Sequence, residues 1–106
     1  MLTERTLQSA IDRIVAAAKP TQVWLFGSHA RGDATEDSDL DILVIEAEVT
    51  DRGAEMARLR RAVGAIGMGV DILVYSEAEA ARRGQVPGTA IYWALKEGRV
   101  MYDARA

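Results

Sequence analysis

The chain of 106 residues is 49% hydrophobic and 27% charged, with a formal net charge of -3 and no cysteine. These values predict one small globular domain over residues 1–106. We expect it in the cytoplasm, because nothing in the sequence calls for disulfides, a signal peptide or a membrane span. The negative net charge argues against a general nucleic-acid-binding protein, which would need clustered Lys and Arg. The absence of cysteine excludes a thiolate metal site and a cysteine nucleophile.

The first predicted elements are a helix and a strand. Residues 7–18 carry apolar side chains with a 3.6-residue period behind a possible N-cap at Thr3, which predicts an amphipathic helix that ends before Pro20. Residues 21–26 are rich in Val, Trp, Leu and Phe and stop at Gly27, so they predict a short buried strand.

Two further strands enclose a helix. Residues 39–46 and 70–75 are short and rich in β-branched side chains, which favours strands over helices. Between them lies an apolar stripe with helical spacing that is closed by glycines. The stripe and its glycines are Met56, Leu59, Val63, Ile66, Gly64, Gly67 and Gly69.

The C-terminal part predicts helices over residues 78–83 and 89–96 and an edge strand over residues 99–102. The tetrapeptide Asp-Ile-Leu-Val occurs at 41–44 and again at 71–74. One short match is weak support for a structural repeat, so we interpret it as two similar strands.

A glycine-rich turn follows the first strand. Gly27 lacks a Cβ and lets the backbone approach a ligand closely. If Ser28 begins a helix, its hydroxyl and the free N–H groups of the first turn form an anion cradle suited to triphosphate oxygens, which Arg31 or Gly32 would support. Taken alone, the same residues also fit an ordinary strand-to-helix turn capped by Ser28.

Three aspartates are the candidate metal ligands. Asp39 and Asp41 are two residues apart on a predicted strand, so their carboxylates point to the same face and repel each other unless a cation lies between them. Asp71 begins another strand and can supply a third carboxylate. Such a set suits two magnesium ions about 3.5 to 4 Å apart, although single aspartates also commonly begin strands and cap turns.

The order of these motifs resembles the signature of the DNA polymerase β-like nucleotidyltransferase superfamily. The matching residues are Gly27-Ser28-His29-Ala30-Arg31-Gly32, then Ser38-Asp39-Leu40-Asp41, then Asp71. The short length and the tail Gly88-Thr89-Ala90-Ile91-Tyr92 through Arg99-Val100-Met101-Tyr102 are similar to the minimal nucleotidyltransferases of this superfamily. The resemblance covers residues 21–102.

The resemblance implies an α/β (α+β) nucleotidyltransferase fold, in which helices cover one face of a mixed sheet and the active site occupies the other. It implies that Ser28 contacts the phosphates of ATP and that Asp39 and Asp41 hold magnesium. Asp71 would bind one metal ion and help to activate the acceptor hydroxyl. The expected reaction is transfer of AMP.

The resemblance also implies a partner. Many minimal nucleotidyltransferases are antitoxins that transfer AMP to a tyrosine of a HEPN-domain toxin, so we expect a type VII-like antitoxin in a homo- or hetero-oligomer. One alternative is an enzyme that modifies a small molecule such as an aminoglycoside after homodimerisation. Another is a non-catalytic antitoxin that neutralises its partner by occlusion.

Other conspicuous side chains have plainer explanations. His29 is expected in a solvated loop or partner contact rather than in catalysis. The aromatic residues of the predicted elements favour core or interface positions; they are Trp24, Phe26, Tyr92 and Trp93. The helical arginines fit solvated faces, contacts to a partner or contacts to the triphosphate, and the sequence leaves these three open. They are Arg58, Arg60, Arg61, Arg82 and Arg83.

Overall fold

The computed structural model describes residues 2–106 and has five helices and four strands in that range. The helices are α1 (Glu4–Ala18), α2 (Ser28–Arg31), α3 (Arg52–Val63), α4 (Glu77–Arg83) and α5 (Ala90–Glu97). The strands are β1 (Gln22–Phe26), β2 (Leu40–Glu46), β3 (Val70–Ser76) and β4 (Arg99–Asp103). Each predicted helix and strand is confirmed, except that α3 ends at Val63 and leaves Ile66 of the predicted stripe outside the helix.

Side-chain caps define where the helices begin. Thr3 accepts a hydrogen bond from the Thr6 N–H at 3.1 Å and confirms the predicted N-cap of α1. Asp51 likewise accepts from the Ala54 N–H at 3.0 Å, so α3 begins earlier than its apolar stripe indicates. Asp51 was not recognised as a cap because several acidic residues precede it.

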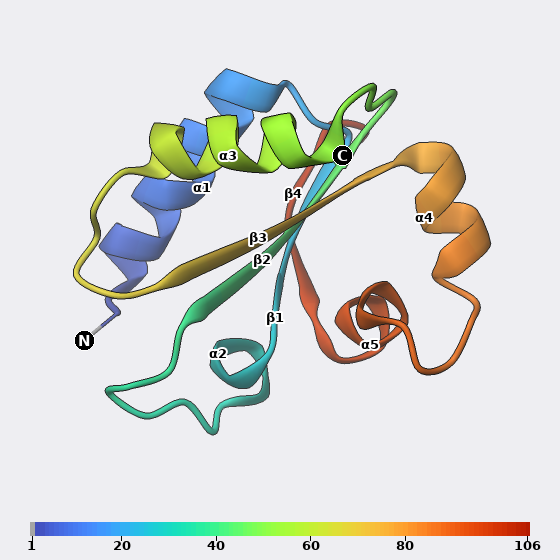
Figure 1. The fold of residues 1–106 in the computed structure, drawn as a ribbon. Helices are drawn as coiled ribbons and strands as arrows, with labels where there is room; N and C mark the ends of the chain where they lie inside the picture. Colours follow the sequence, from blue (N-terminus) through green and yellow to red (C-terminus); the bar gives the residue numbers. More distant parts are fainter. Residues whose placement is uncertain (1) are drawn as a thin grey trace.

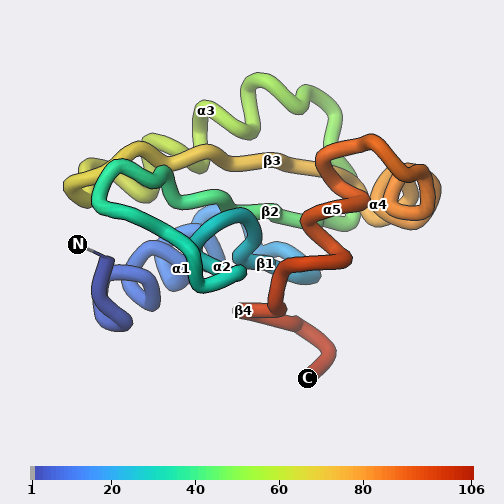
Figure 2. Tube along the Cα trace, turned by 90° about the horizontal axis from the view of Figure 1, so that it is seen from below, coloured from blue at the N-terminus to red at the C-terminus, as the bar shows by residue number. Residues whose placement is uncertain are grey.

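The strands form one mixed sheet in the order β3-β2-β1-β4 (Figure 2). β1 pairs antiparallel with both β2 and β4, whereas β2 and β3 are parallel. The parallel pair is joined by α3, which crosses over the sheet between the two strands. β3 and β4 are therefore the two edges of the sheet.

One face of the sheet is covered by α1 and α3, which lie together in Figure 1. Their apolar sides pack on alternate residues of the strands, and the largest of these side chains are fully buried. The core of this face comprises Leu7, Ala10, Ile11, Ile14, Val23, Leu25, Leu40, Ile42, Val44, Leu59, Val63, Val70, Ile72 and Val74. This arrangement confirms the expected helical layer.

The opposite face is covered at one end only. There α4 and α5 pack Ala80, Ile91 and Ala94 against Leu43 and Ile45 of β2 (Figure 1). The other end of this face carries polar side chains from the starts of β2 and β3. The sequence prediction placed helices on one face alone, so these two short helices add a partial second layer. No helix within residues 2–106 has the length and apolarity that a membrane crossing requires.

Glu46, at the end of β2, is a buried carboxyl group far along the strand from Asp41. Its side chain is 9% exposed, and its Oε2 atom has no hydrogen-bond partner among the described residues. Burial, together with the neighbouring Glu55 carboxyl, raises the pKa of Glu46 to about 7, although Arg58 opposes the shift. The folded protein is therefore more stable when the Glu46 carboxyl is protonated.

Glu46→Gln is expected to raise the melting temperature at pH 8 and to change it less at pH 5. A carboxyl group whose pKa is raised on folding favours the folded state below its ordinary pKa, and that contribution is lost as the pH rises through about 7. Glutamine stays neutral and avoids the loss. Thermal unfolding at both pH values measures the difference, and equal effects at pH 5 and pH 8 would contradict this assignment.

Candidate active site

Two of the three candidate aspartates meet on neighbouring strands. Asp41 of β2 is paired in register with Asp71 of β3, on the face that also carries Leu43 and Leu73. The two Asp-Ile-Leu-Val segments, 41–44 and 71–74, thus lie side by side along their whole length. Because neighbouring strands are about 4.8 Å apart, the two carboxylates share one small region of the sheet.

Asp39 precedes β2 by one residue and lies beside Gly69, which precedes β3 by one residue. The Leu40 N–H donates to the Gly69 carbonyl at 2.9 Å, which sets Gly69 beside Asp39. A Cβ atom added at Gly69 would overlap the Asp39 carboxylate. The sequence indicated Gly69 only as a helix stop, so its contact with Asp39 was missed.

Asp41 lies against Gly27, the residue that follows β1. Gly27 has a φ of 74°, and a Cβ atom there would overlap the Asp41 carboxylate. Phe26, the last residue of β1, is the register partner of Asp41 and brings the turn close to this carboxylate. The glycine therefore leaves room for the Asp41 carboxylate, in addition to the predicted approach to a ligand.

Asp39 and Asp71 lie close enough to Asp41 to influence its ionisation. Burial of Asp41, and then the negative charges of Asp71 and Asp39, raise the pKa of the Asp41 carboxyl, while His29 and Arg31 oppose this. A divalent cation would relieve this repulsion, so the oxygen donors present fit such an ion.

The aspartates supply only part of a metal coordination shell, and a bound nucleotide would complete it. Among residues 2–106, no group of three acidic, histidine or cysteine side chains forms a ready-made metal cluster. Magnesium is commonly bound by one or two carboxylates together with substrate phosphates and water. The aspartates therefore match an ion that binds together with a nucleotide.

The predicted phosphate cradle is a single turn of helix. In α2, the N–H groups of Ala30 and Arg31 donate to the Gly27 carbonyl at 3.1 and 3.0 Å, and Gly32 donates to the Ser28 carbonyl at 2.9 Å. Ser28 itself follows Gly27 directly and so begins next to Asp41. The turn confirms that a helix starts at Ser28.

The side chains of Arg31 and His29 point to other groups. The Arg31 guanidinium lies 3.3 Å from Asp33 and 3.9 Å from Glu97, and it is 44% exposed. The Nε2 atom of His29 lies 3.4 Å from the Ser38 carbonyl oxygen, within the loop that leads to Asp39. Their charges reach Asp41, but their hydrogen bonds do not involve the three aspartates.

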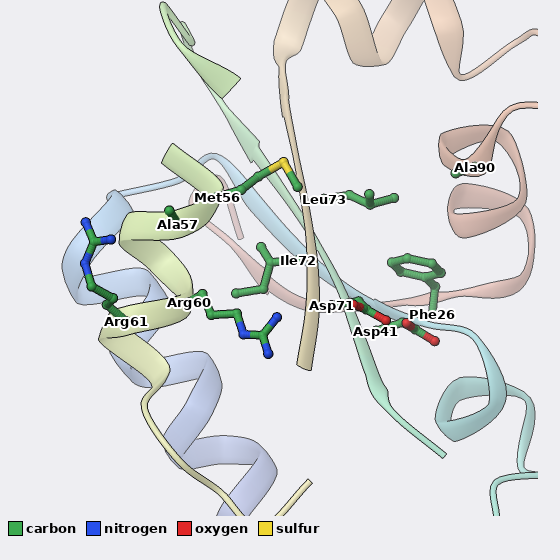
Figure 3. Close-up of a pocket in the computed structure, with 10 residues that line it drawn as sticks. All are labelled: Phe26, Asp41, Met56, Ala57, Arg60, Arg61, Asp71, Ile72, Leu73 and Ala90. Atoms are coloured by element: carbon green, nitrogen blue, oxygen red, sulfur yellow. The ribbon is translucent and has the colours of Figure 1, made fainter. Parts of the chain in front are cut away.

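A cleft of about 730 Å³ opens beside the carboxylates (Figure 3). Asp41, Asp71, Phe26, Leu73 and Ala90 line it on the site face, and Met56, Ala57, Arg60, Arg61 and Ile72 line it on the side of α3. Ser28 and Asp39 lie outside this lining. The sequence left the role of Arg60 and Arg61 open. It also gave no sign that Met56 and Phe26 line the same cavity, because this depends on how β3 lies between α3 and β1.

Comparisons with known proteins agree with the fold and the motif order. Residues 7–99 match the family described as the nucleotidyltransferase domain. A protein of Methanocaldococcus jannaschii named "Putative protein adenylyltransferase" is 33% identical, over 90% of this chain and 97% of its own length. The chain therefore belongs to the nucleotidyltransferase family and is a nucleotidyltransferase of the minimal type.

Two solved structures share the fold. One is described as a "putative nucleotidyltransferase" from Sulfolobus solfataricus, with a TM-score of 0.55 and 22% identity over 98% of this chain and 92% of that one. The other is a toxin-antitoxin with AMP-PNP, with a TM-score of 0.55 and 21% identity over 92% of this chain and 74% of that one. Both confirm the expected nucleotidyltransferase fold.

Gly69→Ala is expected to lower the rate of nucleotidyl transfer by about 10²-fold with little change in stability, because its methyl group displaces the Asp39 carboxylate. Gly69 is not among the glycines with a positive φ, so alanine fits its backbone. Gly53→Ala is the matched control, since its added methyl group meets only an ordinary contact at 3.7 Å. Steady-state kinetics and thermal unfolding of both variants test this; equal rates for the two would refute the role of Gly69.

Proposed function

We propose that the protein transfers AMP from ATP to a tyrosine hydroxyl of a partner HEPN-domain toxin and thereby neutralises it as a type VII-like antitoxin in the cytoplasm. The observation that carries this proposal is the in-register pair Asp41 and Asp71, which lines a cleft of about 730 Å³ and has Asp39 nearby. The names of the archaeal relative and of the toxin-antitoxin neighbour support a protein acceptor.

The nucleotide would bind on the site face, with its phosphates at the turn after β1. Gly27 and the Ser28 hydroxyl and N–H would contact phosphate oxygens beside Asp41. Arg31 is 44% exposed in its pairs with Asp33 and Glu97, so its guanidinium is free to turn to the phosphates when a more negative partner arrives.

The reaction is an in-line displacement at the α-phosphorus. The tyrosine oxygen forms a bond to the α-phosphorus, the bond from that phosphorus to the bridging oxygen breaks, and pyrophosphate leaves. Asp71, at the outer strand of the pair, would accept the hydroxyl proton on its carboxylate. Positioning of the two reactants supplies much of the rate enhancement, because the attacking and leaving oxygens must lie in line.

Asp39, Asp41 and Asp71 would hold magnesium, with two ions as the expected number. The bound metal supplies charge neutralisation at the phosphates and lowers the pKa of the attacking hydroxyl. Burial raises the pKa of Asp41 most, and the neighbouring charges of Asp71 and Asp39 raise it further; this clustering of negative charge supports the assignment.

Asp39→Ala is expected to abolish neutralisation of the toxin and to leave the complex intact. Removing one carboxylate weakens metal and phosphate binding, whereas Asp39 is exposed and contributes nothing to the core. Growth rescue of cells that express the toxin, together with co-purification of the two proteins, measures both properties. Rescue by Asp39→Ala with a stable complex would instead establish neutralisation by occlusion.

A further inference from the structure

The cleft extends past the catalytic face to the free edge of β3. Asp71 and Leu73 line it on one side of this strand, and Met56, Ala57 and Arg60 of α3 line it on the other (Figure 3). β3 is the outermost strand of the sheet on this side, so the cleft follows an unpaired strand edge. A ligand confined to the site face would leave the half beneath α3 unused.

The hydrogen-bonding groups of this edge can be assigned from the pairing of β2 and β3. The Leu40 N–H donates to the Gly69 carbonyl, and Leu40 is in register with Val70. In a parallel ladder this pattern directs the odd-numbered residues of β3 to β2. The N–H and C=O groups of Val70 and Ile72 consequently point to the edge beside the cleft, whereas Val74 is fully buried and closed to a further strand.

The two edges of the sheet differ in how open they are to pairing. β3 is paired with β2 over seven residues without a register shift and has neither proline nor lysine. β4, the other edge, has a register shift opposite Val23 and Trp24 and begins with the exposed Arg99. Irregularity and charge discourage strand addition, so β3 is the edge suited to accept another strand.

Resting on the function proposed above, we propose that the acceptor protein docks as an extended segment that pairs with the free edge of β3. A residue opposite Asp71 in such a pair has its side chain on the site face, with its Cβ atom about 5 Å from that of Asp71. Pairing with β3 therefore brings an acceptor tyrosine to the carboxylates by backbone contacts alone.

The residues that line the cleft also predict the side-chain chemistry of the residues before and after the acceptor tyrosine. Because side chains alternate along a strand, the residues before and after the tyrosine face α3. There Met56 and Ala57 favour an apolar side chain, and Arg60, which extends from α3 toward β3 in Figure 3, favours an acidic one. The expected recognition element is an extended acid-tyrosine-apolar segment.

Amide hydrogen exchange of the whole protein, with the peptide Thr-Glu-Tyr-Val-Thr as probe, tests this docking. The amides of Val70 and Ile72 should exchange about tenfold more slowly in the peptide complex. The same peptide methylated on all its backbone nitrogens should have no effect, because it cannot pair with the strand. Unchanged exchange of these two amides at saturating peptide, or no binding of the peptide, would overturn the proposal.

A matched pair of charge reversals tests the contribution of α3. Arg60→Glu should weaken peptide binding about tenfold, whereas Arg82→Glu, an exposed arginine in the last turn of α4 outside the cleft, should not. Equal effects would mean that Arg60 acts only through net charge and would remove the α3 side from the docking site.

Two further results separate this docking from its alternatives. Strong protection of Val70 and Ile72 already in the free protein, with a dimer in solution, would make this edge a contact between two copies and overturn acceptor docking. Asp41→Asn should retain full peptide protection, because Asp41 is one strand inside the edge. Retained protection in a protein that transfers no AMP would contradict the proposed function alone.

Discussion

Asp41→Asn is expected to lower the rate of AMP transfer by about 10³-fold or more without destabilising the protein. The substitution removes the half-buried carboxylate that lies between Asp39, Asp71 and the Gly27 turn, and it leaves an amide of the same shape. Loss of a preorganised charge at a phosphoryl-transfer site has effects of about this size. Steady-state transfer kinetics at saturating ATP measure the loss.

Stability should change in the opposite direction from activity. Since burial and two neighbouring carboxylates raise the pKa of Asp41, its contribution to the free energy of unfolding is highest below its ordinary pKa and is lost as the pH rises through the folded-state pKa. At pH 7 without metal, Asp41→Asn should therefore melt at the same or a higher temperature. Asp12→Asn, an exposed aspartate of α1 on the opposite face, is the control that should change neither property; a lower melting temperature for Asp41→Asn would refute the electrostatic account.

Gly27→Ala is expected to reduce both stability and activity, for two separable reasons. Its φ of 74° and ψ of -157° lie in a region that alanine adopts only with a strain of about 1 to 3 kcal/mol. Its added Cβ would also overlap the Asp41 carboxylate and displace it from the site. We expect about 10²-fold slower transfer, measured together with the free energy of unfolding in urea.

Gly64→Ala measures the effect of backbone strain alone on the free energy of unfolding and on activity. Gly64 ends α3 with a φ of 72° and a ψ of -163°, nearly the conformation of Gly27, and its added Cβ would meet only an Arg13 nitrogen at 3.7 Å. Both variants should lose similar stability, but only Gly27→Ala should lose activity. Equal activity losses in the two variants would show that strain, and not displacement of Asp41, is responsible.

The elements of the fold were predictable because each has a local signal. The period of α1, the cap at Thr3 and the alternating strand residues depend on sequence neighbours alone. The start of α3 was less clear, since its cap at Asp51 lies among other acids. The partial cover by α4 and α5 depends on where two short helices dock on the sheet, which no local pattern contains.

The candidate site likewise combines features that have a local sequence signal with features that depend on tertiary contacts. Spacing along one strand predicted that Asp39 and Asp41 share a face, and the structure places Asp39 one residue before β2. The pairing of Asp41 with Asp71 depends instead on the register between two strands. The repeated Asp-Ile-Leu-Val segments are aligned residue by residue in the observed register. The same alignment places Gly69 beside Asp39. The sequence does not tell whether two similar strands are neighbours, so the repeat alone could not establish the contact.

The central claim is that these carboxylates transfer the α-phosphoryl group of ATP, as AMP, to a protein. The most direct test incubates the protein and its co-purifying partner with magnesium and ATP labelled at the α-phosphate, with γ-labelled ATP and Asp41→Asn as controls. We predict label on the partner from α-labelled ATP only, and none with Asp41→Asn. Label from γ-labelled ATP, equal labelling by Asp41→Asn, or a stable complex with no label on any protein would contradict the account.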